Sequence, residues 1–152
     1  TGEKIKYSTT LQYVPKISLR PDIGCFVIFS GDYSGLLVMN FSDGAAMHLY
    51  TSYMKAMGIP ESELVKDSTS SEVADTIGEI TNQIMGRGVR MVEKKFDLSS
   101  FFGQPKALAL NNSIILTPDY DYQDSRRIAL SIGTDRFYIE IAMERTEFKK
   151  ME

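Results

Sequence analysis

Two carboxylates and an amide stand at helical spacing near the middle of the sequence, as Asp75, Glu79 and Asn82. On an ideal helix, at roughly 100° per residue, these side chains and Gly86 fall within a stripe roughly 60° wide. Such a helix presents two hydrogen-bond acceptors followed by a carboxamide, which both donates and accepts. Polar rows usually do no more than keep a helix face soluble, so spacing alone favours a solvated surface. A role in chemistry needs support from the rest of the sequence.

The same segment carries an apolar stripe on its opposite side, which is typical of a helix that lies against a sheet. The stripe comprises Val73, Ile77, Ile80, Ile84 and Met91. Thr69 and Glu72 match a capping box, in which the hydroxyl and the carboxylate each satisfy a backbone N–H at the helix start. These patterns predict a helix from about Ser70 to Lys95.

Two glycines, Gly78 and Gly86, lie inside this predicted helix. Each costs up to about 1 kcal/mol of helix stability relative to alanine. Glycines at that cost indicate either close packing or the approach of another molecule. Fraying or a kink near the helix end would also account for Gly86, but we expect a partner protein to lie against this face at Gly78 and Gly86.

The remaining elements follow from apolar alternation, turn residues and caps. A second helix is predicted over Asp43–Met57, capped by Ser42 or Asp43 and ended by Gly58 with Pro60. Residues 30–35 form a predicted hairpin turn, and residues 97–104 a predicted loop. The predicted strands are Leu11–Leu19, Ile23–Phe29, Leu36–Phe41, Lys106–Leu110, Ser113–Thr117, Arg126–Ile132 and Phe137–Met143.

Composition excludes several classes of protein. The 152 residues suit one domain, 1–152, and the absence of an initiator Met is consistent with a piece of a longer protein. A net charge of −3, with no more than two adjacent Lys or Arg residues, argues against duplex nucleic acid and anionic membranes as partners. Apolar runs are too short to cross a bilayer, which takes about 20 residues. No signal-peptide pattern opens the chain.

One cysteine and one histidine limit the chemistry further. Cys25 cannot form an internal disulfide, and with His48 it supplies too few ligands for a zinc site. Cys25 lies in an apolar run typical of a buried strand, and His48 has no catalytic partner at a recognisable spacing. We therefore expect a core thiol, a core or rim histidine and a reducing, cytoplasmic location.

The spacing of the polar row resembles the motif of one family. Asp75-x3-Glu79-x2-Asn82, followed after twenty-two residues by Pro105, is similar to the (S/D)-x3-E-x2-N-x22-P signature of the CheC/CheX/FliY phosphatases of bacterial chemotaxis. The segment 74–86 also resembles the family's helix, in which a glycine precedes the glutamate. Residues 35–41 resemble its glycine-led strand, and the resemblance extends from about Ile23 to Leu110.

The resemblance implies an α+β, CheC/CheX-like two-layer fold, with a mostly antiparallel sheet of about six strands and two main helices packed on it. Members with two active sites repeat the motif on their first helix, where this chain has Met47 and Tyr50. The pattern is thus like CheX, with one site per chain. The family usually begins with another helix, which residues 1–10 do not supply.

The resemblance also implies an activity, removal of the phosphoryl group from a CheY-like response regulator. Asn82 would orient the attacking water, and Glu79 would pair with the regulator's active-site lysine. Asp75 would orient neighbouring polar groups or contact the regulator, and Pro105 would shape the adjoining loop. The chain would bind no metal or cofactor, because Mg²⁺ belongs to the regulator, and it would form a homodimer.

Two other functions stay open at this point. The first is a non-catalytic interaction domain of the same fold, which binds a response regulator or a flagellar-switch component. The second is a small-molecule sensing domain, for which the sequence has no ligand motif and which a largely apolar interior pocket would favour.

Overall fold

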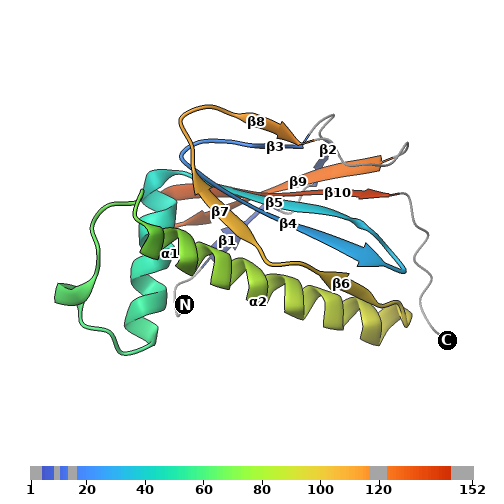
Figure 1. Ribbon diagram of the computed structural model, residues 1–152, viewed down its shortest axis with the longest axis horizontal. Coiled ribbons are helices and arrows are strands. Elements are labelled where there is room, and N and C mark those ends of the chain that lie inside the picture. The colour runs from blue at the N-terminus through green and yellow to red at the C-terminus, as the bar shows by residue number, and fades with distance from the viewer. Residues whose placement is uncertain (1–4, 9–10, 14–16, 117–122, 145–152) are drawn as a thin grey trace.

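The computed structural model describes residues 5–8, 11–13, 17–116 and 123–144 (Figure 1). The helices are α1 (Asp43–Ala56) and α2 (Ser71–Phe96), with a 3₁₀ turn, η1 (Glu61–Glu63), between them. The strands are β1 (Ile5–Tyr7), β2 (Gln12–Tyr13), β3 (Ile17–Leu19), β4 (Ile23–Gly31), β5 (Gly35–Phe41), β6 (Ser100–Phe102), β7 (Lys106–Ala109), β8 (Ile114–Leu116), β9 (Gln123–Ile132) and β10 (Asp135–Glu144).

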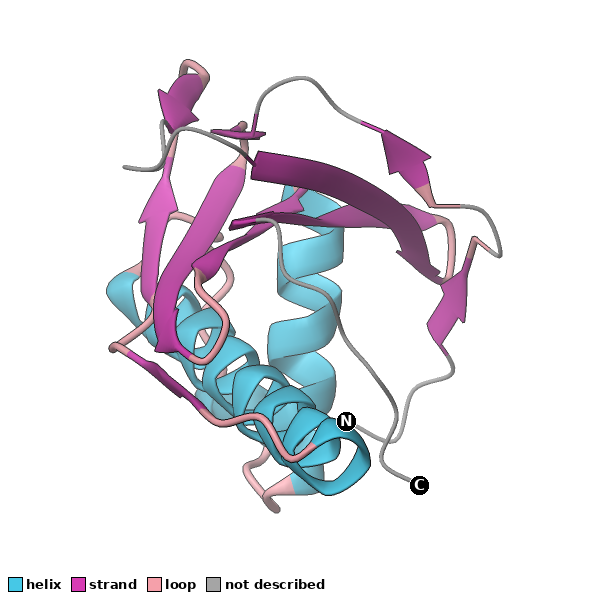
Figure 2. Cartoon of the chain, turned by 90° about the vertical axis from the view of Figure 1, so that its right-hand side faces the viewer, coloured by secondary structure: helices cyan, strands magenta, loops and turns pink. Residues whose placement is uncertain are grey.

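Eight of these strands form one antiparallel sheet in the order β1-β9-β10-β5-β4-β6, with β2 paired to β9 and β7 paired to β4. Strands β3 and β8 form a separate antiparallel pair. Both helices lie against one face of the large sheet, and the β3–β8 pair lies over the other (Figures 1 and 2). The α+β class and the antiparallel sheet are confirmed, with more strands than the six expected because short strands such as β1 and β6 were not predicted.

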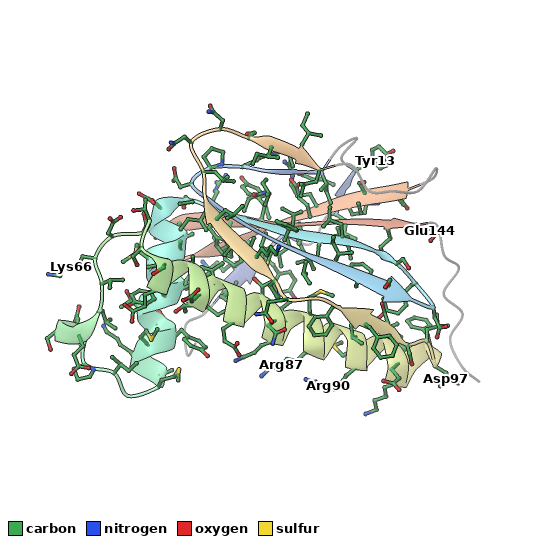
Figure 3. All side chains as sticks on the ribbon, in the orientation of Figure 1. Tyr13, Lys66, Arg87, Arg90, Asp97 and Glu144 are labelled. Atoms are coloured by element: carbon green, nitrogen blue, oxygen red, sulfur yellow. The ribbon has the colours of Figure 1, made fainter. Side chains whose placement is uncertain are left out.

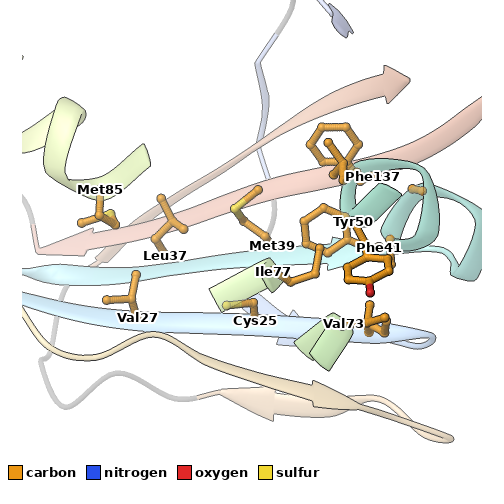
Figure 4. Packing of buried hydrophobic residues seen from close by; sticks show 14 of the residues in the cluster. Cys25, Val27, Leu37, Met39, Phe41, Tyr50, Val73, Ile77, Met85 and Phe137 are labelled. Atoms are coloured by element: carbon orange, nitrogen blue, oxygen red, sulfur yellow. The ribbon is translucent and has the colours of Figure 1, made fainter. Parts of the chain in front are cut away.

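The main core lies between the central strands and the helices. Strands β4 and β5 pair with Cys25 opposite Met39, and both side chains face the helix side. There they meet Val73 and Ile77 of α2 and Tyr50 of α1 (Figure 4). Alternation along the strands thus turns one face toward α2, as expected of a sheet covered by helices.

A second, smaller core lies on the opposite face of the sheet. Ile17 and Leu19 of β3 pack there against residues of β5 and β10. The same face buries the Glu140 carboxylate completely, with Arg20 Nη2 at 3.6 Å and Arg127 Nη1 at 3.7 Å from its Oε1. The small β3–β8 layer therefore covers a mixed surface that holds a buried ion-pair cluster.

Several predicted elements are present, and others need correction. The two helices and strands β4, β5, β7, β8, β9 and β10 lie within a few residues of their predicted bounds. The predicted strand Leu11–Leu19 is wrong, because β2 and β3 are separate strands in different sheets and residues 14–16, with Pro15, lie outside the described part. The predicted loop 97–104 contains β6, whose Phe102 packs against the core.

The start of α2 differs from the predicted capping box. Ser70 is the cap, and its side chain accepts a hydrogen bond from the backbone N–H of Val73 at 3.4 Å. The Thr69 hydroxyl donates instead to Asp67 Oδ1 at 2.8 Å. Asp67 competes for that hydroxyl, so the helix begins one residue later than the box requires. Ser42 is confirmed as the cap of α1.

Candidate functional site

Helix α2 is held against the sheet by a buried face that mixes apolar and hydroxyl side chains. Val73, Ile77, Thr81 and Met85 are buried. The Thr81 hydroxyl donates to the Ile77 carbonyl at 2.8 Å and lies 3.5 Å from Met39 Sδ. Because this hydroxyl is satisfied within its own helix, a threonine can occupy the core contact without leaving an unpaired polar group.

The predicted apolar stripe is therefore partly wrong. Ile84 is 37% exposed and Met91 is 70% exposed, so these two do not belong to the buried face. The helix is rotated about its axis relative to the predicted orientation. Thr81 and Met85 face the sheet, in place of Ile84 and Met91. In this orientation Gly78 and Gly86 lie beside the β6–β7 segment, near Pro105 and Phe102 respectively.

The polar row lies along the outer side of α2. Asp75 and Glu79 are exposed, and Asn82 is half-buried. Gln83 donates from Nε2 to Glu79 Oε1 at 3.3 Å, so the Glu79 carboxylate has a neighbour on its own helix. Within the described residues, the side chains of Asp75 and Asn82 make no hydrogen bond and no ion pair. Their polar groups are thus available to another molecule.

The segment between β6 and β7 borders this row on one side. Pro105 is buried there, and a Cβ added at Gly78 would lie 3.9 Å from the Pro105 carbonyl oxygen. Gly78 itself is buried beside this segment, and its contact with a partner stays a prediction. The 3.9 Å separation is an ordinary contact, so an alanine would fit at this position.

Gly86 is half-buried and faces a side chain that sequence reasoning did not single out. A Cβ at Gly86 would lie 3.5 Å from Nη1 of Arg90 and 3.9 Å from Cζ of Phe102. The Arg90 guanidinium thus lies back over the glycine, one turn beyond Asn82. The spacing Gly86-x3-Arg90 is the signal that could have drawn attention to it, because residues four apart share a helix face.

Charge is divided along the exposed side of α2. The first half carries acidic side chains, and the second half is mainly basic, with Glu93 as the exception in its run. The exposed charges, in order, are Glu72, Asp75, Glu79, Arg87, Arg90, Glu93, Lys94 and Lys95. Figure 3 shows Arg87 and Arg90 projecting from α2 away from the sheet. Asn82 therefore lies between a negative and a positive stretch.

Helix α1 has no corresponding row. Tyr50 is fully buried, and its hydroxyl accepts a hydrogen bond from the Val65 N–H at 3.2 Å. Met47 is half-buried against the core. The two positions that the motif would need on α1 are thus packing positions.

The other candidate residues lie away from the row. Cys25 is buried, and desolvation raises the pKa of its thiol, which opposes nucleophilic use. His48 lies at the rim of the core, with Nδ1 at 3.6 Å from Asp135 Oδ2. In the described part of the chain, no three His, Cys, Asp or Glu side chains form a group that could hold a metal ion.

Two open, mainly apolar hollows lie along α2. One, of about 270 Å³, lies between α1, α2 and the sheet and has Gln83 and Arg87 in its wall. The other, of about 210 Å³, lies farther along α2 against β5 and β10. Gln83 therefore touches both the first hollow and, through its hydrogen bond, Glu79 of the polar row.

The architecture, two helices on one face of a mostly antiparallel sheet, is the fold of solved CheX structures. A chemotaxis protein CheX from Desulfovibrio desulfuricans superposes with a TM-score of 0.75 at 14% identity, over 94% of this chain and 87% of that one. CheX from Vibrio vulnificus superposes with a TM-score of 0.69 at 19% identity, over 93% of this chain and 86% of that one. A chain of a CheX–CheY–BeF3–Mg²⁺ complex from Borrelia burgdorferi superposes with a TM-score of 0.68 at 14% identity, over 95% of this chain and 86% of that one. At such identities the likeness establishes the fold.

The chain belongs to the family described as Protein of unknown function (DUF3334), whose family model matches residues 1–152. No curated protein is detectably similar to it in sequence. No helix within the described residues is long and apolar enough to span a membrane.

Proposed function

We propose that this protein is an aspartyl-phosphate phosphatase that acts on a phosphorylated CheY-like response regulator. The observation that carries the proposal is the exposed polar row of Asp75, Glu79 and Asn82 on α2, with Pro105 in the adjoining segment. The fold supports it, because a protein of the same fold is the CheX of a complex that also contains CheY, BeF3 and Mg²⁺.

The proposed reaction is attack of water on the phosphorus of the regulator's aspartyl phosphate. The phosphorus–oxygen bond to the aspartate breaks, which leaves a free carboxylate on the regulator and inorganic phosphate. Phosphoryl transfer depends mainly on positioning and electrostatics, so a helper protein accelerates it by holding the water in line. The Asn82 carboxamide suits this role because it has both donor and acceptor groups.

The other residues of the row would position the regulator. Glu79 would pair with the regulator's active-site lysine, and its exposure on α2 leaves it accessible for this contact. Asp75 would contact the regulator beside it. Pro105 would shape the segment that borders the row, since its ring fixes the backbone φ angle and removes an N–H. Mg²⁺ would be held by the regulator and by no residue of this chain.

The test is phosphate release from a phosphorylated CheY-like regulator under single-turnover conditions. Wild-type protein should accelerate release, and Asn82→Ala should slow the accelerated rate by about a hundredfold, the scale of losing one positioned polar group. Asn112→Ala is the matched control. This substitution removes the same amide group from an exposed residue outside the site. Equal rates with wild type, Asn82→Ala and no added protein would remove the proposal.

Binding of the regulator without any acceleration would instead support the non-catalytic interaction domain, with a response regulator or flagellar-switch component as its partner. The hollows beside α2 are smaller than the roughly 300 Å³ at which ligand pockets usually begin, and they are open rather than interior. They give the sensing alternative little support.

The proposal also includes a homodimer and a cytoplasmic location. Sedimentation of the purified protein tests whether it is a dimer.

A further inference from the structure

The Arg90 guanidinium occupies a defined place beside the polar row. Its Nη1 and Nη2 atoms lie 3.5 and 3.9 Å from the position that a Cβ at Gly86 would take. These separations are ordinary van der Waals contacts, so the guanidinium lies directly alongside the helix at position 86. The Arg90 side chain thus lies back along the helix beside Gly86, one turn beyond Asn82.

Arg90 has no partner inside the described part of the protein. The side chain is exposed, and it makes no hydrogen bond or ion pair with any residue there. Arg87, only three residues earlier, lines the hollow between α1 and α2 instead. Two exposed arginines on one helix therefore face different surroundings, and only Arg90 stands next to the polar row.

The row has opposite charges on the two sides of Asn82. Glu79 precedes Asn82 by three residues, and the Arg90 guanidinium lies at the level of Gly86, four residues after it. Each charge is therefore about one helical turn, roughly 4.5 to 6 Å, from Asn82 along the helix axis. One ion pair leaves a docked partner free to rotate, whereas two pairs of opposite sign fix its direction on the helix.

We infer that Arg90 is a docking residue that binds a carboxylate on the surface of the response regulator, and this inference rests on the proposed function. A Mg²⁺ ion beside a phosphoryl group is held by one or two carboxylates, so the rim of such a site is acidic. Guanidinium groups match carboxylates with two parallel hydrogen bonds. With Glu79 on a lysine and Arg90 on a carboxylate, reversed docking brings like charges together.

The experiment compares Arg90→Glu with Arg87→Glu, which makes the same change of net charge at a residue that lines the hollow between α1 and α2. Affinity is measured for the regulator with and without BeF3 and Mg²⁺, at low and high salt. Arg90→Glu should weaken binding of both forms about tenfold and flatten the salt dependence. Arg87→Glu should change affinity by less than about threefold, and Arg90→Lys should recover part of the loss.

Three results would overturn the inference. These are an unchanged affinity for Arg90→Glu, an equal loss for Arg87→Glu, and a loss confined to the BeF3 form, which would place Arg90 on the phosphoryl group. The rate at saturating protein should stay within about twofold of wild type for Arg90→Glu, since the proposed contact acts on docking. Failure of the proposed function would look different, because wild-type protein itself would then not accelerate phosphate release.

Discussion

Gln83 Nε2 donates a hydrogen bond to Glu79 Oε1 at 3.3 Å, so the carboxylate proposed to meet the regulator's lysine already has a contact one turn along α2. The contact is exposed, and a hydrogen bond of this kind contributes about 0.5 kcal/mol. An ionised carboxylate has room for further donors, since its two oxygens accept about four hydrogen bonds. The Gln83 contact therefore orients Glu79 without occupying it fully.

A division of labour between Glu79 and Asn82 follows from their proposed partners. Glu79→Ala should raise the Kd for the regulator about tenfold and leave the rate at saturation within about threefold, because it loses a docking contact. Gln83→Ala should change the Kd by less than about threefold. A titration with single-turnover rates separates the two effects. An unchanged Kd for the Glu79 variant would contradict the division.

The donor half of the Asn82 amide should be essential to the chemical step. Asn82→Asp keeps the size and the acceptors but removes the donor and adds a negative charge beside the phosphoryl group. The saturated rate should fall at least as far as with Asn82→Ala, by about a hundredfold. Asn82→Gln should retain more activity than either variant. Full activity of the aspartate variant would show that the amide does not work through its donor.

Because of Cys25, the free energy of unfolding should decrease as the pH rises into the alkaline range. Burial raises the pKa of its thiol above the ordinary value, so the folded state keeps the proton to higher pH than the unfolded state does. The stability from the neutral thiol is full below the unfolded pKa, about 8.5, and is lost as pH rises through the raised folded pKa.

Urea unfolding of wild type and Cys25→Ala at pH 7 and pH 10 measures this contribution. At pH 7 the variant should be less stable by about 1 kcal/mol, from the smaller side chain in the core. The difference should shrink at pH 10, where the unfolded wild-type thiol ionises. An identical difference at both pH values would count against the raised pKa.

The buried Glu140 carboxylate should depend on its two arginines. Its oxygens have no direct hydrogen bond, so Arg20 and Arg127, at 3.6 and 3.7 Å, supply the charge that offsets its desolvation. Replacing both arginines by alanine should destabilise the fold by about 2 to 3 kcal/mol, because it leaves a buried charge uncompensated. Adding Glu140→Gln to that variant should recover part of the loss in urea unfolding. No recovery would mean that the arginines act through packing alone.

Much of the architecture could be predicted from local patterns. Hydrophobic periodicity, helix caps and glycine-bearing turns predict α1, α2 and the paired strands β4 and β5. All of these signals act within a few residues. Predictions failed where another group competes, whether it lies two residues away or across the fold. The Thr69 hydroxyl bonds Asp67 rather than capping α2, and Phe102 joins an edge of the sheet because the core next to α2 has room for its ring.

By itself the sequence determined which residue types stand at helical intervals, and so that Asp75, Glu79 and Asn82 would share one side of a helix. Only the tertiary structure decided how that helix is turned about its axis, because the choice depends on buried hydroxyls such as that of Thr81. That turn buries Gly78 and exposes Ile84. It also sets the Phe102 ring of β6 beside Gly86, a contact between two elements that the pattern of apolar residues does not determine.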